Sequence, residues 1–135
     1  FRLAQQQQRP GWTQIYQFLE DQLTLGISFV RPHYDQQKRF QGVLGADFAL
    51  TDINRFLKQI SNDSRIFIIE RDGNVVATSS GQPPFTAQKT RLKAVEMDDL
   101  VTRTTAQQMQ ERVPNLLQIR DRQQLQFQLD GKDHF

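Results

Sequence analysis

A single carboxylate interrupts an otherwise apolar stretch of the chain. Residues 40–50, FQGVLGADFAL, carry Asp47 as their only ionisable side chain. An ionised carboxylate inside a buried strand costs several kcal/mol unless it is paired. Because side chains alternate along a strand, Asp47 shares a face with Val43, Gly45 and Ala49, and these small neighbours leave space for a ligand. The pattern therefore predicts either a structural partner or a ligand for Asp47.

The sequence pattern leaves two interpretations of Asp47 open. In the first, Asp47 receives the ammonium group of a ligand through charge-assisted hydrogen bonds. In the second, it accepts hydrogen bonds from backbone or hydroxyl groups near a helix start at Thr51, or it faces water at a strand end. Carboxylates in strands often have structural partners, so the strand pattern alone does not decide between these roles.

No other residue pattern favours catalysis or metal binding. His33 and His134 are far apart in sequence and cysteine is absent, so no metal or cofactor site is predicted. We expect His33 to be a solvated loop residue, and Tyr34 and Asp35, close to Pro32, to be turn residues. No serine stands in a G-x-S-x-G setting, and no glycine-rich loop has phosphate-binding spacing. We therefore predict that this region is not an enzyme.

Composition and charge limit the other classes of function. The chain has 135 residues and a formal net charge of +2, with basic and acidic residues interspersed, which predicts no nucleic-acid surface. An RNA-binding sheet would need exposed paired aromatic residues with flanking basic residues, and these are lacking. No window approaches the roughly 18 apolar residues of a membrane span. Contact with a membrane is therefore expected only through segments outside this chain.

The first part of the chain predicts a helix end followed by an antiparallel meander. Residues 1–8 are typical of the end of a helix. Apolar and polar residues alternate over residues 23–30, which predicts a half-buried strand with residues 13–19 as its hairpin partner. Residues 31–39 would then connect this strand to the apolar stretch at residues 40–50.

A helix is predicted at residues 51–60, because the period changes from two to 3.6. Its apolar face consists of Ile53, Phe56, Leu57 and Ile60. Thr51 or Asp52 is expected to cap its N-terminus. A tight hairpin follows at residues 66–80, since Asp72 and Gly73 form a dipeptide that favours such turns.

The last part of the chain predicts a loop, a helix and a strand. Residues 81–85 form the loop, and residues 98–112 form the helix, with Asp98 and Asp99 at its start. The inward side chains of this helix are expected to be Leu100, Val101, Ala106 and Met109. Residues 123–129 alternate as a strand, and the chain stops where a partner strand would begin. We expect an α+β fold of two modules, each incomplete in this chain.

The order of these segments resembles the double Cache domain, the extracytoplasmic sensor region of bacterial transmembrane receptors. The resemblance covers nearly the whole chain, and its most specific pieces are GWTQIY, ISFVRPHYD, FQGVLGADFAL, TDINRFLKQI and FIIERDGNVVATS. It implies PAS-like antiparallel sheets with flanking helices in two tandem modules. Residues 1–50 would be the C-terminal half of the membrane-distal module. Residues 51–135 would be the linking helix and the N-terminal part of the membrane-proximal module.

The resemblance implies a function as well as a fold. Such a region binds a small molecule, for example an amino acid or an amine, in the distal pocket and transmits a conformational signal to a cytoplasmic kinase or nucleotide cyclase. It would lie in the periplasm or outside the cell and would form a homodimer through receptor assembly. The alternative is a structural or dimerisation module that binds no small ligand.

The resemblance also assigns site residues. Asp47 matches the aspartate that receives the ligand's amino group, and Tyr16 matches a strand tyrosine of the motif. Phe1 replaces a tyrosine and Phe18 replaces a second aspartate, which leaves a more apolar pocket. The arginine and tryptophan of the family motif would lie just before Phe1. Tyr16 and Trp12 would supply aromatic walls or a cation–π contact beside Asp47.

Overall fold

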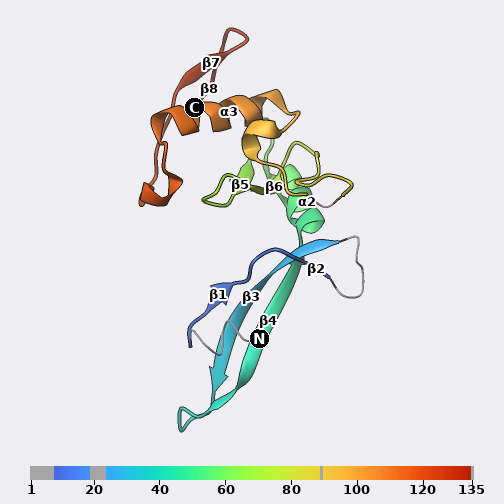
Figure 1. Cartoon of the computed structure of the whole chain (residues 1–135), viewed down its shortest axis with the longest axis vertical. Coiled ribbons are helices and arrows are strands. Elements are labelled where there is room, and N and C mark those ends of the chain that lie inside the picture. Colours follow the sequence, from blue (N-terminus) through green and yellow to red (C-terminus); the bar gives the residue numbers. More distant parts are fainter. Residues whose placement is uncertain (1–7, 19–23, 89, 135) are drawn as a thin grey trace. The chain divides into compact units, whose positions relative to one another are not determined.

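The computed structural model describes residues 8–18, 24–88 and 90–134 of the chain. The chain divides into two compact units, Phe1–Ile53 and Asn54–Phe135. An antiparallel sheet forms the first unit, and antiparallel hairpins with a long helix form the second (Figure 1). The fold is therefore α+β, as predicted. None of the helices in the described ranges has the length and apolar character that crossing a bilayer requires.

The sheet of the first unit is organised around strand β3, Leu25–Tyr34. On one side β3 pairs antiparallel with β4, Phe40–Ala49, and Figure 1 shows the two as one long hairpin. Its other edge pairs with two short strands, β1 (Gly11–Trp12) and β2 (Tyr16–Gln17). The predicted meander is confirmed, except that its first strand is divided into two short ones.

The hairpin between β3 and β4 is longer than predicted. Strand β3 continues past Val30 to Tyr34, so His33 lies in a strand rather than in the expected loop. Asp35 closes the turn, because its carboxylate accepts hydrogen bonds from the backbone N–H groups of Gln37 (2.9 Å) and Arg39 (2.8 Å). The Arg39 N–H in particular holds the pKa of Asp35 below its ordinary value. The predicted helix end at residues 1–8 lies outside the described residues, apart from Gln8.

Helix α2, Leu50–Ile60, follows β4 without an intervening loop. It begins one residue earlier than predicted, so Thr51 and Asp52 lie in its first turn instead of capping it. The boundary between the two units falls inside this helix. Strand β4 and the start of the second unit are thus joined by a continuous helix.

The buried face of α2 also differs from the prediction. Leu57 is buried, at 5% exposure, but Phe56 and Ile60 are 56% and 49% exposed. Buried positions of α2 and its C-terminal neighbour follow the spacing i, i+7 and i+11, at Leu50, Leu57 and Ser61. This line lies on one face of a helix with 3.6 residues per turn. The buried face therefore lies on a different side of the helix from the predicted one, although both include Leu57. The positions of apolar residues alone do not show which side of a helix packs against the rest of the protein.

The second unit continues after α2 with the predicted hairpin. Strands β5 (Phe67–Ile69) and β6 (Val75–Thr78) pair antiparallel on either side of the Asp72–Gly73 turn. Gly73 has φ +87°, a conformation that glycine adopts without steric cost. Every residue of β6 is buried. The core of this unit consists of Val75, Ala94, Met97 and Ala106, with Phe67, Ile69, Leu92 and Val95 packed against them.

Helix α3, Leu100–Arg112, follows the short 3-10 helix η1, Ala94–Glu96. α3 begins two residues later than the predicted helix at 98–112, so Asp99, which was expected in the first turn, is its N-cap. Ala106 is buried as expected, and Val101 and Met109 are half-buried, but Leu100 is 42% exposed. Thr102, which was not expected to be inward, is buried, and its hydroxyl donates a hydrogen bond to the cap residue Asp99.

The chain ends in a hairpin that the sequence did not predict in full. A second 3-10 helix, η2 (Leu116–Gln118), precedes strand β7, Phe127–Leu129, which is shorter than the predicted strand at 123–129. β7 pairs with β8, Lys132–His134. The expectation that the partner strand is missing is therefore wrong. Phe127 and His134, which face each other in this ladder, stack with ring centroids 5.5 Å apart.

We predict that two neighbouring residues of α2 respond differently to truncation. Leu57→Ala should lower the free energy of unfolding by about 2–5 kcal/mol, because it removes buried methyl groups and leaves a cavity. Phe56→Ala, on the exposed side of the same helix, should change it by less than about 0.5 kcal/mol. Chemical denaturation of both variants checks this. Equal losses would contradict the buried face described above.

Candidate ligand-binding site

The register of the first sheet places three polar side chains on one face. Ser28 pairs directly with Asp47, and Tyr16 pairs with Gly26, which is two residues before Ser28. Paired residues of an antiparallel ladder point to the same face, and so do residues two apart on one strand. Tyr16, Ser28 and Asp47 therefore converge, and we call them the hydroxyl–carboxylate cluster.

Hydrogen bonds join all three members of the cluster. Ser28 Oγ donates to Asp47 Oδ1. The Tyr16 hydroxyl lies 2.5 Å from Ser28 Oγ and 3.2 Å from the same Asp47 oxygen. Each hydroxyl has one proton, so Ser28 gives its proton to Asp47 and Tyr16 shares its own between Ser28 and Asp47. Both bonds to Asp47 end on Oδ1, and Oδ2 accepts no hydrogen bond from the described residues.

Asp47 itself is exposed, so it does not lie inside a buried strand but faces water, as one of the alternatives left open by the sequence had it. Most of β4 is exposed, whereas Ser28 on the neighbouring strand is buried. Because Asp47 stays in contact with water, it needs no partner to offset a desolvation cost. Its hydroxyl partners come from adjacent strands and not from the helix start near Thr51. Both interpretations of Asp47 survive in changed form, with one oxygen bound structurally and one available.

Ser28 and Thr13 are site residues that sequence reasoning missed. The Thr13 N–H donates to the Ser28 carbonyl oxygen at 2.9 Å, and the Ser28 N–H donates to Thr13 Oγ1 at 3.0 Å. These bonds fix the backbone of Ser28 while its hydroxyl faces Asp47. Alternation within the strand indicated that Ser28 lies on the polar face. Only the register between strands shows that it stands opposite Asp47.

Phe18 covers the sheet next to the cluster. Its ring lies edge-on to that of Tyr16, with centroids 5.6 Å apart. It also lies directly over Gly26, where a Cβ atom would come within 2.2 Å of the Phe18 ring. Gly26 therefore provides the space that Phe18 occupies. Phe18, predicted as a site residue, is brought next to Tyr16 as an apolar wall.

The structure separates Trp12 from the cluster. Trp12 pairs with Phe29, and odd-numbered and even-numbered residues of β3 point to opposite faces of the sheet. The Trp12 ring contacts Phe29 and Phe48, with centroid distances of 5.2 Å and 5.8 Å. The expectation that Trp12 lines the same wall as Tyr16 is therefore wrong. Phe1, the remaining predicted site residue, lies outside the described residues.

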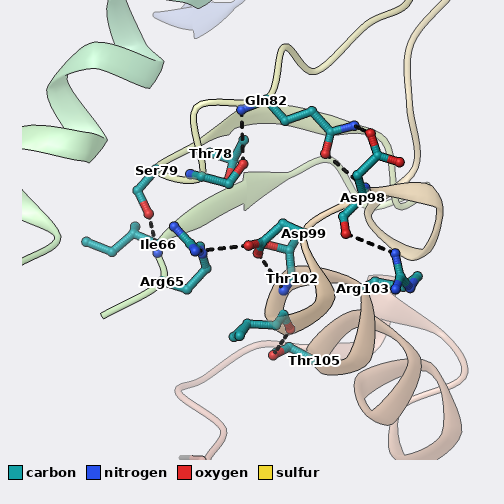
Figure 2. A network of polar contacts seen from close by, with 12 residues as sticks. Arg65, Ile66, Thr78, Ser79, Gln82, Asp98, Asp99, Thr102, Arg103 and Thr105 are labelled. Atoms are coloured by element: carbon teal, nitrogen blue, oxygen red, sulfur yellow. Dashed lines mark hydrogen bonds and ion pairs between the residues drawn. The ribbon is translucent and has the colours of Figure 1, made fainter. Parts of the chain in front are cut away.

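A second polar network holds the loops of the second unit around the start of α3 (Figure 2). Asp99 accepts hydrogen bonds from the backbone N–H (2.9 Å) and the hydroxyl (2.6 Å) of Thr102, and it forms an ion pair with Arg65 at 2.9 Å. Nearby, the side chain of Gln82 makes reciprocal hydrogen bonds with Asp98, at 3.0 Å and 2.9 Å. Two loops are therefore tied to one helix start.

The pKa of Asp99 reflects these contacts. Partial burial raises the pKa of the carboxyl group, but the hydrogen bonds from Thr102 and the charge of Arg65 outweigh this effect, so that the pKa lies below its ordinary value. A lowered pKa means that the folded protein favours the ionised carboxylate.

The described residues contain no group of three or more histidine, aspartate or glutamate side chains that could hold a metal ion. No protein-family model matches the chain. No curated protein matches it either.

We predict that Gly26 and Gly45, both on the cluster face of the sheet, differ in their tolerance of a methyl group. Gly26→Ala should displace the Phe18 ring and lower the free energy of unfolding by about 1–3 kcal/mol. Gly45→Ala is the control, because the nearest atom to the added Cβ would be a methyl carbon of Val30 at 3.8 Å, an ordinary van der Waals contact. In the background of Phe18→Ala, the cost of Gly26→Ala should largely disappear. Equal costs at the two glycines would contradict the placement of Phe18.

We predict a pH-dependent contribution from Asp99. Asp99→Ala should lower the free energy of unfolding by about 0.5–2 kcal/mol at neutral pH, and Asp99→Asn, which keeps the cap, should lower it less. Because the folded pKa is depressed, the stability due to the charge is present above the unfolded pKa of about 3.9 and is lost as the pH falls through the folded value. The difference between wild type and Asp99→Asn should therefore vanish in acid. A difference that persists below the folded pKa would refute the charge contribution.

Proposed function

We propose that this chain is part of the extracytoplasmic ligand-sensing region of a bacterial transmembrane signalling receptor, with the hydroxyl–carboxylate cluster as its ligand site. The available Oδ2 of Asp47 is the observation that carries the proposal. Hydroxyl groups of Ser28 and Tyr16 orient this exposed carboxylate through its other oxygen. An oriented carboxylate with one open oxygen can accept charge-assisted hydrogen bonds from an ammonium group.

The neighbours of the cluster favour a small amine or amino acid with an apolar substituent. Phe18 and Tyr16 provide adjacent aromatic rings on the same side of the sheet. An aromatic face attracts a cation and also packs against apolar groups. Gly45 and Ala49 leave room beside Asp47, because they are the small residues two positions away on β4.

The connection between β4 and α2 offers a route for transmission. Asp47 lies near the end of β4, and the chain passes directly into α2, whose later residues belong to the second unit. A ligand that binds one arrangement of β4 more tightly would shift the population toward it. The proposal assigns residues 1–50 and 51–135 to two tandem PAS-like modules, and the change would pass through the second module to a membrane segment and a cytoplasmic output domain.

A structural role is the second candidate function. It is favoured by the hydrogen bonds of Asp47 to Ser28 and Tyr16, which join β2, β3 and β4 without any ligand. In that case the chain would be a structural or dimerisation module of an extracellular region. The two candidates differ in what the loss of the Asp47 charge would change.

The variant Asp47→Asn distinguishes the ligand-binding candidate from the structural one. A thermal-shift screen of the chain against amines, amino acids and organic acids should first identify a ligand among those that carry an ammonium group. Asp47→Asn should weaken its binding about 10- to 150-fold, since a hydrogen bond to a charged group contributes roughly 1.5–3 kcal/mol. The melting temperature without ligand should hardly fall, because Asp47 is exposed.

Asp121→Asn, at another exposed aspartate, is the control and should leave affinity and stability unchanged. A ligand-free Asp47→Asn variant with a clearly lower melting temperature and normal binding would support the structural candidate and remove Asp47 from the ligand site.

A further inference from the structure

A cavity of about 830 Å³ lies within the second unit. It is bordered by the end of α2 and the loop that follows it, the start of β5, the two residues just after β6, α3 and the hairpin β7–β8. Its size falls in the range of small-molecule pockets. The wall combines hydroxyl groups and charges with the apolar rings of Phe67 and Phe127.

Two cationic side chains line this cavity. Lys58 lies in the last turn of α2, and no carboxylate of the described residues forms an ion pair with it. Arg65 is held by its ion pair with Asp99, which Figure 2 shows at the start of α3. A guanidinium group has five N–H donors, so this ion pair does not use up its capacity. Lys58 therefore offers an ammonium group without an ion-pair partner among the described residues, and Arg65 offers further N–H donors, beside the carboxylates of Asp63 and Asp133 in the same wall.

Two serine hydroxyls in the wall have protons to donate. Ser79 Oγ accepts a hydrogen bond from the Ile66 N–H at 3.0 Å, and Ser80 Oγ accepts one from the Gln82 N–H at 3.2 Å. Neither hydroxyl donates a hydrogen bond to any described residue. Since their oxygens already accept from the backbone, a group that accepts hydrogen bonds is the complementary partner.

We propose that this cavity is a second small-molecule site that takes a carboxylate, bound by Lys58 and by the hydroxyls of Ser79 and Ser80. Phe67 and Phe127 would pack against the apolar part of the ligand. Asp63 and Asp133 also border the cavity, so a ligand with several negative charges is disfavoured. A monocarboxylate and a zwitterionic amino acid both carry the recognised group, and the experiment distinguishes them.

The test uses the isotope-labelled chain and three probes of similar size. Propionate carries only the carboxylate, L-alanine carries both charges, and n-propylamine carries only the ammonium. Saturable shifts of the amide resonances of Ser79, Ser80 and Thr105 with propionate or L-alanine support the proposal, and the stronger of the two identifies the ligand class. If neither probe shifts these resonances at millimolar concentration, or if n-propylamine shifts them equally, the proposal is wrong.

Lys58→Gln provides the matched variant. It should weaken binding of the carboxylate probe by about 10-fold or more, because it removes a charge-assisted hydrogen bond. Lys38→Gln, at an exposed lysine in the first unit, should bind as wild type does. Asp47→Asn should also leave this binding unchanged, which separates the second site from the one proposed above. Equal binding by the Lys58 and Lys38 variants would overturn the proposal.

Discussion

The register between β3 and β4 is the constraint on which the candidate site depends. A slip of β4 by one residue would turn Asp47 to the opposite face of the sheet, toward the side that carries Trp12 and Phe29. The turn at Asp35 helps to fix this register, because its carboxylate binds the N–H groups that close the hairpin. The turn at the far end of the same hairpin therefore contributes to the position of the cluster.

The second unit is organised in a similar way around Asp99. Its apolar core has few fully buried side chains, so polar contacts contribute to holding its loops in place. Asp99 caps α3 and pairs with Arg65, while Gln82 and Asp98 bind each other across the adjoining loop (Figure 2). Arg65 also belongs to the wall of the cavity beside this network. The ion pair of Arg65 with Asp99 therefore helps to position that wall.

The features that the sequence predicted are those that depend on neighbouring residues. The hairpin at Asp72–Gly73 and the helix start near Asp98 and Asp99 follow from local preferences. Ser28 was missed and Trp12 was misplaced because their surroundings depend on how separate strands pair, and alternation within one strand cannot show this. The buried side of α2 was predicted incorrectly for a related reason. Which side of a helix is buried depends on the residues that pack against it, and these are distant in sequence. Asp47 was found by its chemistry, but its exposure was only one of the alternatives that the strand pattern left open.

The central claim is that the open oxygen of Asp47 receives a ligand's ammonium group. The most direct measurement compares the affinity of the amine found by screening with that of its neutral N-acetyl derivative, for wild type and for Asp47→Asn. The account predicts that neutralising the ligand weakens binding to wild type by at least about 10-fold and hardly changes binding to the variant, because the two charges act on each other. Equal losses for both proteins would show that the ammonium group does not bind Asp47.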